Sequence, residues 1–170
     1  FRGAYYQLLC DQEMKTDLIN LTEAFLKKHP RDALALTYLS HGLRLSGRIP
    51  EAVSHLEKLH KLNPSDPVTL NSLGSAYKGL GDFEKAEQFL NRATTVKPDY
   101  GVAYWNKSDI SHSPQEDLAN IKKALTKVSY PANSHFFHFC AYRLLENNGE
   151  YEEAFTHLKT ANEQKRSTLS

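Results

Sequence analysis

Histidines and carboxylates are the side chains of this 170-residue chain that could act in acid–base catalysis or bind a metal. His135 and His138 can share one helix face, but no third ligand follows at the spacing that metal sites use. Carboxylates such as Glu84 and Glu87 are expected on solvated helix faces, where they form weak ion pairs with basic neighbours. The chain has no glycine-rich phosphate loop, no HExxH pair and no nucleophile elbow. The sequence therefore predicts no catalytic, cofactor-binding or metal site, and no enzyme activity in this chain.

Composition limits the classes of partner. A formal charge of +1 lacks the concentrated positive field that nucleic acids or anionic membranes require, so neither is an expected partner. The sequence contains no long apolar run and no signal peptide, which favours a cytoplasmic location. Cys10 and Cys140 are expected to be free, buried thiols. The chain begins with Phe1 and its single methionine is Met14, so we expect a fragment of a longer protein.

A period of 34 residues organises the chain. Prolines recur at Pro30, Pro64 and Pro98, and the pairs Gly47 and Gly81, Ala52 and Ala86, and Leu56 and Leu90 keep the same spacing. The period predicts five helical hairpins, the first of them truncated, in a single domain over residues 1–170. Their approximate ranges are 1–30, 31–64, 65–98, 99–131 and 132–166. In the fourth hairpin the apolar residues, including Leu118 and Val128, come two residues early.

The stretch from Asp66 to Pro98 resembles a tetratricopeptide repeat. Its matching residues fit the pattern W-x₂-L-G-x₂-Y…A-x₃-F…P with two changes from aromatic to leucine, and they are Leu70, Leu73, Gly74, Tyr77, Ala86, Leu90, Ala93 and Pro98. The resemblance extends over nearly the whole chain. It implies an all-α fold, a right-handed superhelix of stacked hairpins, that serves as a protein-interaction scaffold.

Such a scaffold would bind a protein or peptide in the concave groove formed by the first helix of each hairpin. Counting outward from the apolar stripe gives the candidate groove residues Thr37, His41, Arg44, Asn71, Ser75, Lys78, Trp105, Asp109, Phe136, Phe139 and Arg143. Large rigid rings such as Trp105 and Phe139 can anchor a peptide. Alternatively, Trp105 fills space left by the shortened fourth hairpin.

One ligand class of the family is not expected. Chaperone-tail adaptors hold a C-terminal carboxylate with a clamp of Lys, Asn, Asn, Lys and Arg. The matching positions here are Thr37, His41, Ser72, Val102 and Asn106. Only one of these five residues is of the required kind, so the sequence does not favour chaperone-tail binding.

The segment from Lys97 to Arg166 is similar to the region that precedes the catalytic domain in bacterial tetratricopeptide-sulfotransferase proteins. The likeness rests on Tyr104-Trp105, His138-Phe139, Gly149, Tyr151, Phe155 and Asn162. It implies that a catalytic domain follows in cis, and Phe155 would then be a domain-docking residue. The alternative is a freestanding adaptor or oligomerisation scaffold. His157 and Gln164 are expected to form a polar outer face that ends the array.

Overall fold

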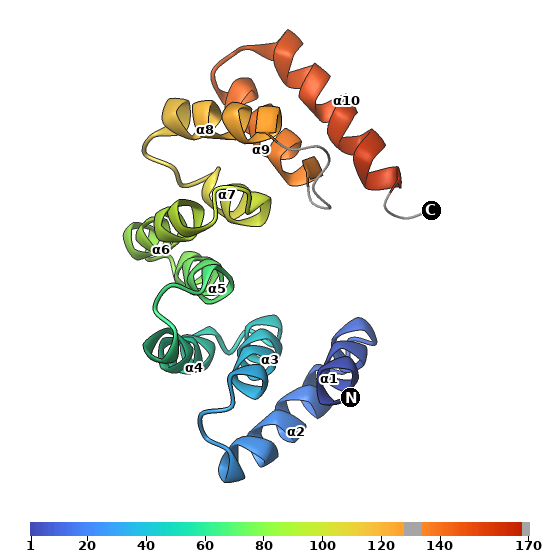
Figure 1. Cartoon of the computed structure of the whole chain (residues 1–170), viewed down its shortest axis with the longest axis vertical. Coiled ribbons are helices and arrows are strands. Elements are labelled where there is room, and N and C mark those ends of the chain that lie inside the picture. Colours follow the sequence, from blue (N-terminus) through green and yellow to red (C-terminus); the bar gives the residue numbers. More distant parts are fainter. Residues whose placement is uncertain (128–133, 168–170) are drawn as a thin grey trace. The chain divides into compact units, whose positions relative to one another are not determined.

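The computed structural model describes residues 1–127 and 134–167, which form helices joined by short connections (Figure 1). The ten helices of these parts are α1 Arg2–Asp11, α2 Lys15–Lys28, α3 Ala33–Leu45, α4 Ile49–Leu62, α5 Pro67–Gly79, α6 Phe83–Val96, α7 Gly101–Lys107, α8 Pro114–Lys127, α9 Ser134–Asn147 and α10 Tyr151–Ser167. Two helices correspond to each predicted hairpin range, although α10 ends one residue beyond the fifth range, and the expected all-α class is confirmed. Val128 and the hairpin boundary predicted at 131 lie outside the described residues.

Helix ends repeat with the sequence period. The side chains of Asp32 and Asp66 cap α3 and α5 by accepting from the backbone N–H groups three residues later, each at 2.8 Å. Gly47 and Gly81 follow α3 and α5 with φ of 77° and 80°, a left-handed conformation that favours glycine. The sequence therefore sets where these helices begin and where they end.

The helices form two compact units, residues 1–86 and residues from 87 onward, and α6 crosses the boundary. In unit 1, residues from α1, α2 and α3 form one buried cluster: Tyr6, Leu9, Leu18 and Ala35. A second cluster joins α2, α3 and α4 and contains Ile19, Leu39, Leu43 and Ala52. These clusters hold α1 and α3 in fixed positions within unit 1. One domain over the whole chain stays a prediction.

In unit 2 the core is built around α9, which packs against α7, α8 and α10. Its buried cluster consists of Tyr104, Ile121, Phe137, Cys140, Ala141, Leu144, Leu145 and Ala154. Cys10 and Cys140 are both free, but only Cys140 is buried as expected, whereas Cys10 is half-buried. Burial raises the pKa of the Cys140 thiol. Helix α8 begins 31 residues after α6, so the expected defect in the fourth hairpin is present but amounts to three residues rather than two.

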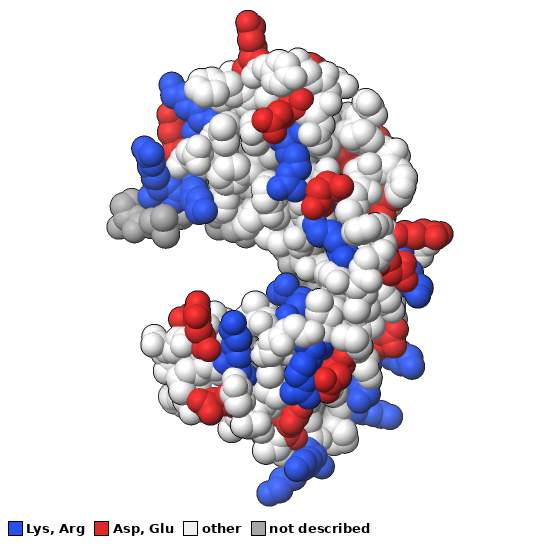
Figure 2. Space-filling view, turned by 180° about the vertical axis from the view of Figure 1, so that it is seen from behind, with Lys and Arg blue, Asp and Glu red and all other residues white. Residues whose placement is uncertain are grey.

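Charged side chains of both signs are spread over the surface. On the face drawn in Figure 2, acidic and basic groups are interspersed rather than gathered by sign. Within residues 1–127 and 134–167 no helix is both long and apolar enough to cross a membrane.

Candidate partner-binding surfaces

Three of the candidate groove residues line one hollow in unit 1. Thr37, His41 and Arg44 lie on successive turns of α3, and α1, α4 and α5 complete the walls. The hollow has a volume of about 310 Å³, and its lining residues are Gln7, Cys10, Thr37, Tyr38, Ser40, His41, Arg44, Leu56, Val68 and Ser72. Helical spacing of three and four residues is what brings the three α3 side chains to one face.

Arg44 gives this hollow its charge. Its side chain is half-buried, and burial lowers the pKa of its guanidinium. Within the described parts its polar contact is with His41, whose Nδ1 lies 3.4 Å from Nη2, and it forms no ion pair with a carboxylate there. Burial, and then the nearby Arg44 charge, lower the pKa of His41, so the imidazole is neutral at pH 7.

The remaining unit 1 candidates are less accessible than the groove assignment requires. Ser75 and Lys78 are half-buried, and neither lines the hollow around Arg44. A groove residue should have a side chain that faces solvent, but Asn71 is only 8% exposed, so this expectation is wrong for Asn71. Asn71 lies beside Leu70 on α5, where a helix buried on most sides leaves little open face. Partner binding by these three residues stays a prediction.

In unit 2, four candidates come together around an aromatic ring. The Arg143 guanidinium lies 3.9 Å from the ring centroid of Trp105, and Phe139 meets that ring edge-on at 6.0 Å. Arg143 also donates to Ser108 Oγ at 3.1 Å and lies 3.9 Å from a carboxylate oxygen of Asp109. Stacking on the indole holds the guanidinium in place and adds a cation–π attraction.

Trp105 is both a packing residue and a surface residue. It packs against the unit 2 core, as expected for a side chain that fills the shortened hairpin, yet it is only half-buried. The fifth candidate, Phe136, packs at a tilt against His135 with ring centroids 4.4 Å apart, and His135 meets Phe139 edge-on at 6.3 Å. The α7 and α9 candidates are therefore linked through a row of rings.

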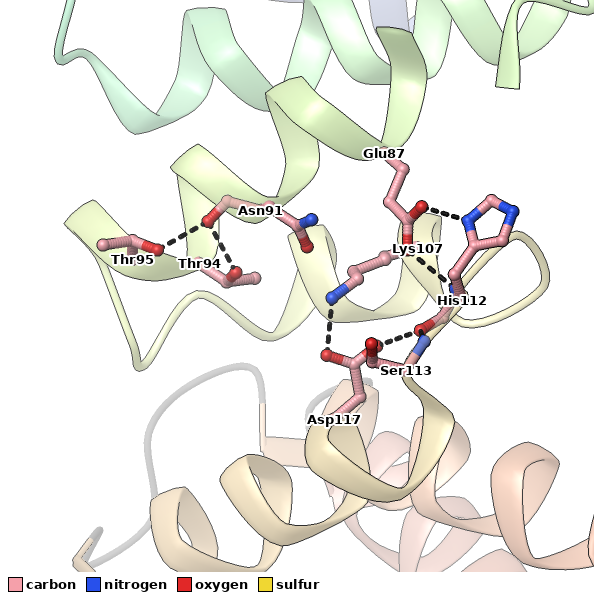
Figure 3. Close-up of polar contacts among 9 residues, drawn as sticks. Glu87, Asn91, Thr94, Thr95, Lys107, His112, Ser113 and Asp117 are labelled. Carbon is pink, nitrogen blue, oxygen red and sulfur yellow. Dashed lines mark hydrogen bonds and ion pairs between the residues drawn. The ribbon is translucent and has the colours of Figure 1, made fainter. Parts of the chain in front are cut away.

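Figure 3 shows a polar cluster between α6, α7 and α8 that the sequence pattern did not reveal. Lys107 Nζ lies 2.6 Å from Asp117 Oδ1, and Ser111 Oγ donates to the other carboxylate oxygen at 2.6 Å. Lys107 follows Leu73 by one period, so a charge on the apolar stripe was the signal that a buried partner must exist.

Glu87, also in Figure 3, was expected to be a solvated carboxylate, and this expectation is wrong. It is half-buried, and it accepts hydrogen bonds from the His112 backbone N–H at 2.8 Å and from the His112 ring. Burial raises the pKa of Glu87, but the bonds from His112 outweigh this effect and hold the pKa below its ordinary value. Glu87 thus ties α6 to the turn before α8.

The histidines form no metal site in the described part of the chain, where no three potential ligands cluster. His138 instead contacts His157 of α10, with the two Nδ1 atoms 2.8 Å apart. Gln164 accepts from Ser134 Oγ at 2.7 Å. His157 and Gln164 therefore contact α9 of their own hairpin, and the expectation that they form a polar outer face is wrong.

Phe155 occupies a repeat position that, in earlier hairpins, is covered by the hairpin that follows. The residues two, three and four periods earlier are Glu87 in α6, Val53 in α4 and Ile19 in α2. Ile19 and Val53 are 5% and 8% exposed, and Glu87 bonds to His112 of the following turn. Phe155 is 67% exposed. A docking residue must face outward, and the exposure of Phe155 agrees with this; the docking itself stays a prediction.

Comparisons with known proteins identify the repeats. The tetratricopeptide repeat family model matches residues 43–107. A TPR repeat-containing protein of Pseudomonas aeruginosa is 34% identical over 95 residues, 54% of this chain and 16% of that protein. Anaphase-promoting complex subunit 3 of Schizosaccharomyces pombe is 24% identical over 106 residues, 61% of this chain and 15% of that protein. The chain therefore spans only a small part of the length of both relatives.

A solved structure extends the likeness to the whole fold. A thermophilic TPR protein of Thermus thermophilus has a TM-score of 0.74 at 21% identity, over 98% of this chain and 91% of that one. The fold is that of tetratricopeptide repeat proteins, and the resemblance to that family is confirmed by the family model over residues 43–107. Tetratricopeptide repeats act as protein-interaction scaffolds.

Proposed function

We propose that this chain binds an extended protein or peptide segment on faces formed by the first helix of each hairpin. The observation that carries the proposal is the hollow in unit 1, because three residues chosen from the sequence as groove residues line it together. A concave site with a few placed polar groups among apolar walls is the usual form of a ligand pocket. Leu56 and Val68 supply such apolar walls here.

The ring cluster in unit 2 supports the same function. Trp105, Phe139 and Arg143 are the residue types that most often dominate binding energies at interfaces. These side chains hold one another in position, so they would lose little conformational entropy when a partner binds. We assign them a second contact with the same kind of partner.

Selection from a phage-displayed library of random peptides tests the proposal. Selected peptides should bind the wild-type chain and lose at least about tenfold in affinity for Thr37→Trp, roughly 1.4 kcal/mol, because the indole fills the hollow. Thr37 is exposed, and among the described residues its hydroxyl bonds only to the Ala33 carbonyl, so the variant should fold normally.

Thr156→Trp is the matched control, since Thr156 is also exposed and bonds to a carbonyl four residues earlier. If no peptide is selected, or if the selected peptides bind Thr37→Trp as well as the control, the site lies elsewhere.

A second candidate function concerns the linked protein rather than the groove. The exposure of Phe155 favours a contact that is missing from this chain, and the sequence resemblance suggests a sulfotransferase domain in cis. A freestanding cytoplasmic adaptor is the alternative. Limited proteolysis near Lys165 and Arg166 in the full-length protein separates them: Phe155→Ser should accelerate cleavage only if a domain packs on α10.

A further inference from the structure

The guanidinium of Arg44 is the feature of unit 1 that the peptide-binding proposal leaves unexplained. It is half-buried in the hollow, and none of the ten residues that line the hollow is acidic. By contrast Arg48, the residue just before α4, donates two hydrogen bonds of 2.7 Å to Glu51. Removing a charge from water is costly unless a counter-charge replaces the solvent. Arg44 bears that cost without a carboxylate in the described parts of the chain.

Neutral donors adjoin this charge. A guanidinium can only donate, so the contact at 3.4 Å makes His41 Nδ1 the acceptor and places the ring proton on Nε2. Ser72, on α5, also lines the hollow, and its hydroxyl forms no hydrogen bond within the described residues. One fixed positive charge with an imidazole N–H and a hydroxyl is a donor set for an anion.

We propose that this hollow binds the carboxylate of an acidic side chain in the partner peptide, with Arg44 as its counter-charge. The proposal rests on the proposed peptide-binding function and names the chemistry of that partner. Charge balance favours a carboxylate over a phosphate dianion, because one guanidinium matches one negative charge and no lysine lines the hollow. Leu56, Val68 and Cys10 provide apolar contact for the methylene groups of such a side chain.

Arg44 stands outside the five positions at which chaperone-tail adaptors hold a C-terminal carboxylate. Those positions here contain Thr37, His41, Ser72, Val102 and Asn106, with no cation among them. The inferred ligand is therefore an internal Asp or Glu of an extended segment, rather than a chain terminus.

A titration with capped amino acids tests the site without any selected peptide. N-acetyl-glutamate N-methylamide should produce a saturable NMR shift of the Arg44 Nε–H group, whereas the capped glutamine should produce none. Inorganic phosphate is the third probe. A shift with phosphate at equal or lower concentration, or no shift with capped glutamate, overturns the assignment of an acidic peptide.

Selected peptides provide the second test. They should be enriched in Asp or Glu at one position, and replacing that residue by its amide should weaken binding at least tenfold. Arg44→Gln should cause the same loss, Arg44→Lys should retain part of the affinity, and Arg48→Gln should bind like wild type. Arg44→Gln should also keep or raise the thermal midpoint, since it removes an unpaired half-buried charge.

The two proposals fail differently. Peptides without an acidic preference that bind Arg44→Gln normally would overturn the carboxylate site and leave the scaffold function standing. If no peptide is selected, the scaffold proposal fails, and the capped-glutamate titration still decides whether Arg44 binds a carboxylate.

Discussion

Burial of charge is costly, and unit 2 buries two charged side chains against each other. The side chains of Lys107 and Asp117 are each 7% exposed, and their ion pair of 2.6 Å links short α7 to α8. Ser111 satisfies the second carboxylate oxygen. A pair of this kind contributes little over an apolar pair, but losing one member leaves the other charge stranded.

Asp117→Ala should therefore lower the free energy of unfolding by about 3–5 kcal/mol, measured by urea denaturation. The double variant Lys107→Leu with Asp117→Ala should recover most of this loss, because Leu73 and Ala86 stand at the corresponding positions of the third hairpin. A single variant no less stable than the double variant would contradict this role for the pair.

The His138–His157 contact should make stability depend on pH. Burial, and then His157, lower the pKa of His138 to about 4, whereas an unfolded histidine titrates near about 6.5. Between these values the unfolded state binds the additional proton, so stability is complete above about pH 6.5 and falls as the pH drops toward 4. Glu153, 3.9 Å from His157 and paired with Lys122, opposes this effect only partly.

His138→Phe should accordingly lose less stability between pH 7 and pH 5 than wild type, by on the order of 1–2 kcal/mol after allowance for partial exposure. Urea unfolding at both pH values measures the difference, with His29→Phe as a control on an exposed histidine. Equal losses in wild type and His138→Phe would exclude the His pair as the cause.

Among the elements, α2 and α3 approach each other at a glycine. A Cβ added at Gly42 would lie 3.0 Å from Ile19 Cγ1 and 3.4 Å from Leu18 Cδ2, so a larger side chain must displace both. Gly42→Leu should destabilise unit 1 by about 1–3 kcal/mol in thermal or urea unfolding. Gly3→Leu, where an added Cβ meets Leu34 at 3.6 Å, should cost far less, and similar costs at both sites would refute the close-packing role.

The face of α10 behaves differently from the corresponding face of α2. Phe155→Ser should change the unfolding free energy of this chain by less than about 0.5 kcal/mol, because the ring is already in water. Ile19→Ser, at the same position four periods earlier, should cost about 2–5 kcal/mol. A large loss from Phe155→Ser would make Phe155 a core residue and remove the docking argument.

At the scale of the whole molecule, much of the fold could be predicted from helix-capping and helix-ending residues that recur every 34 residues. Asp66, Gly81 and Pro98 mark helix ends by local backbone chemistry, so their effect does not depend on distant contacts. The residues that were predicted wrongly depend on tertiary packing. Asn71 is buried, and His157 faces its own hairpin, because packing rather than spacing decides which side of a helix is covered.

The candidate site was readable only in part, for the same reason. Helical spacing grouped Thr37, His41 and Arg44, but it could not show that Arg44 lacks an acidic neighbour. The Lys107–Asp117 pair was missed because a three-residue shift at α8 breaks the period. Contacts across such a shift follow from three-dimensional packing.

Photo-crosslinking of a selected peptide tests most directly whether the first helices hold the partner. A photoreactive group placed beside the acidic residue of the peptide should crosslink within residues 37–44 of α3 or 68–72 of α5, as mapped by mass spectrometry, and Thr37→Trp should abolish the product. Crosslinks to exposed α4 residues such as Ser54 or Glu57 would place the partner on the second helices and contradict the proposal.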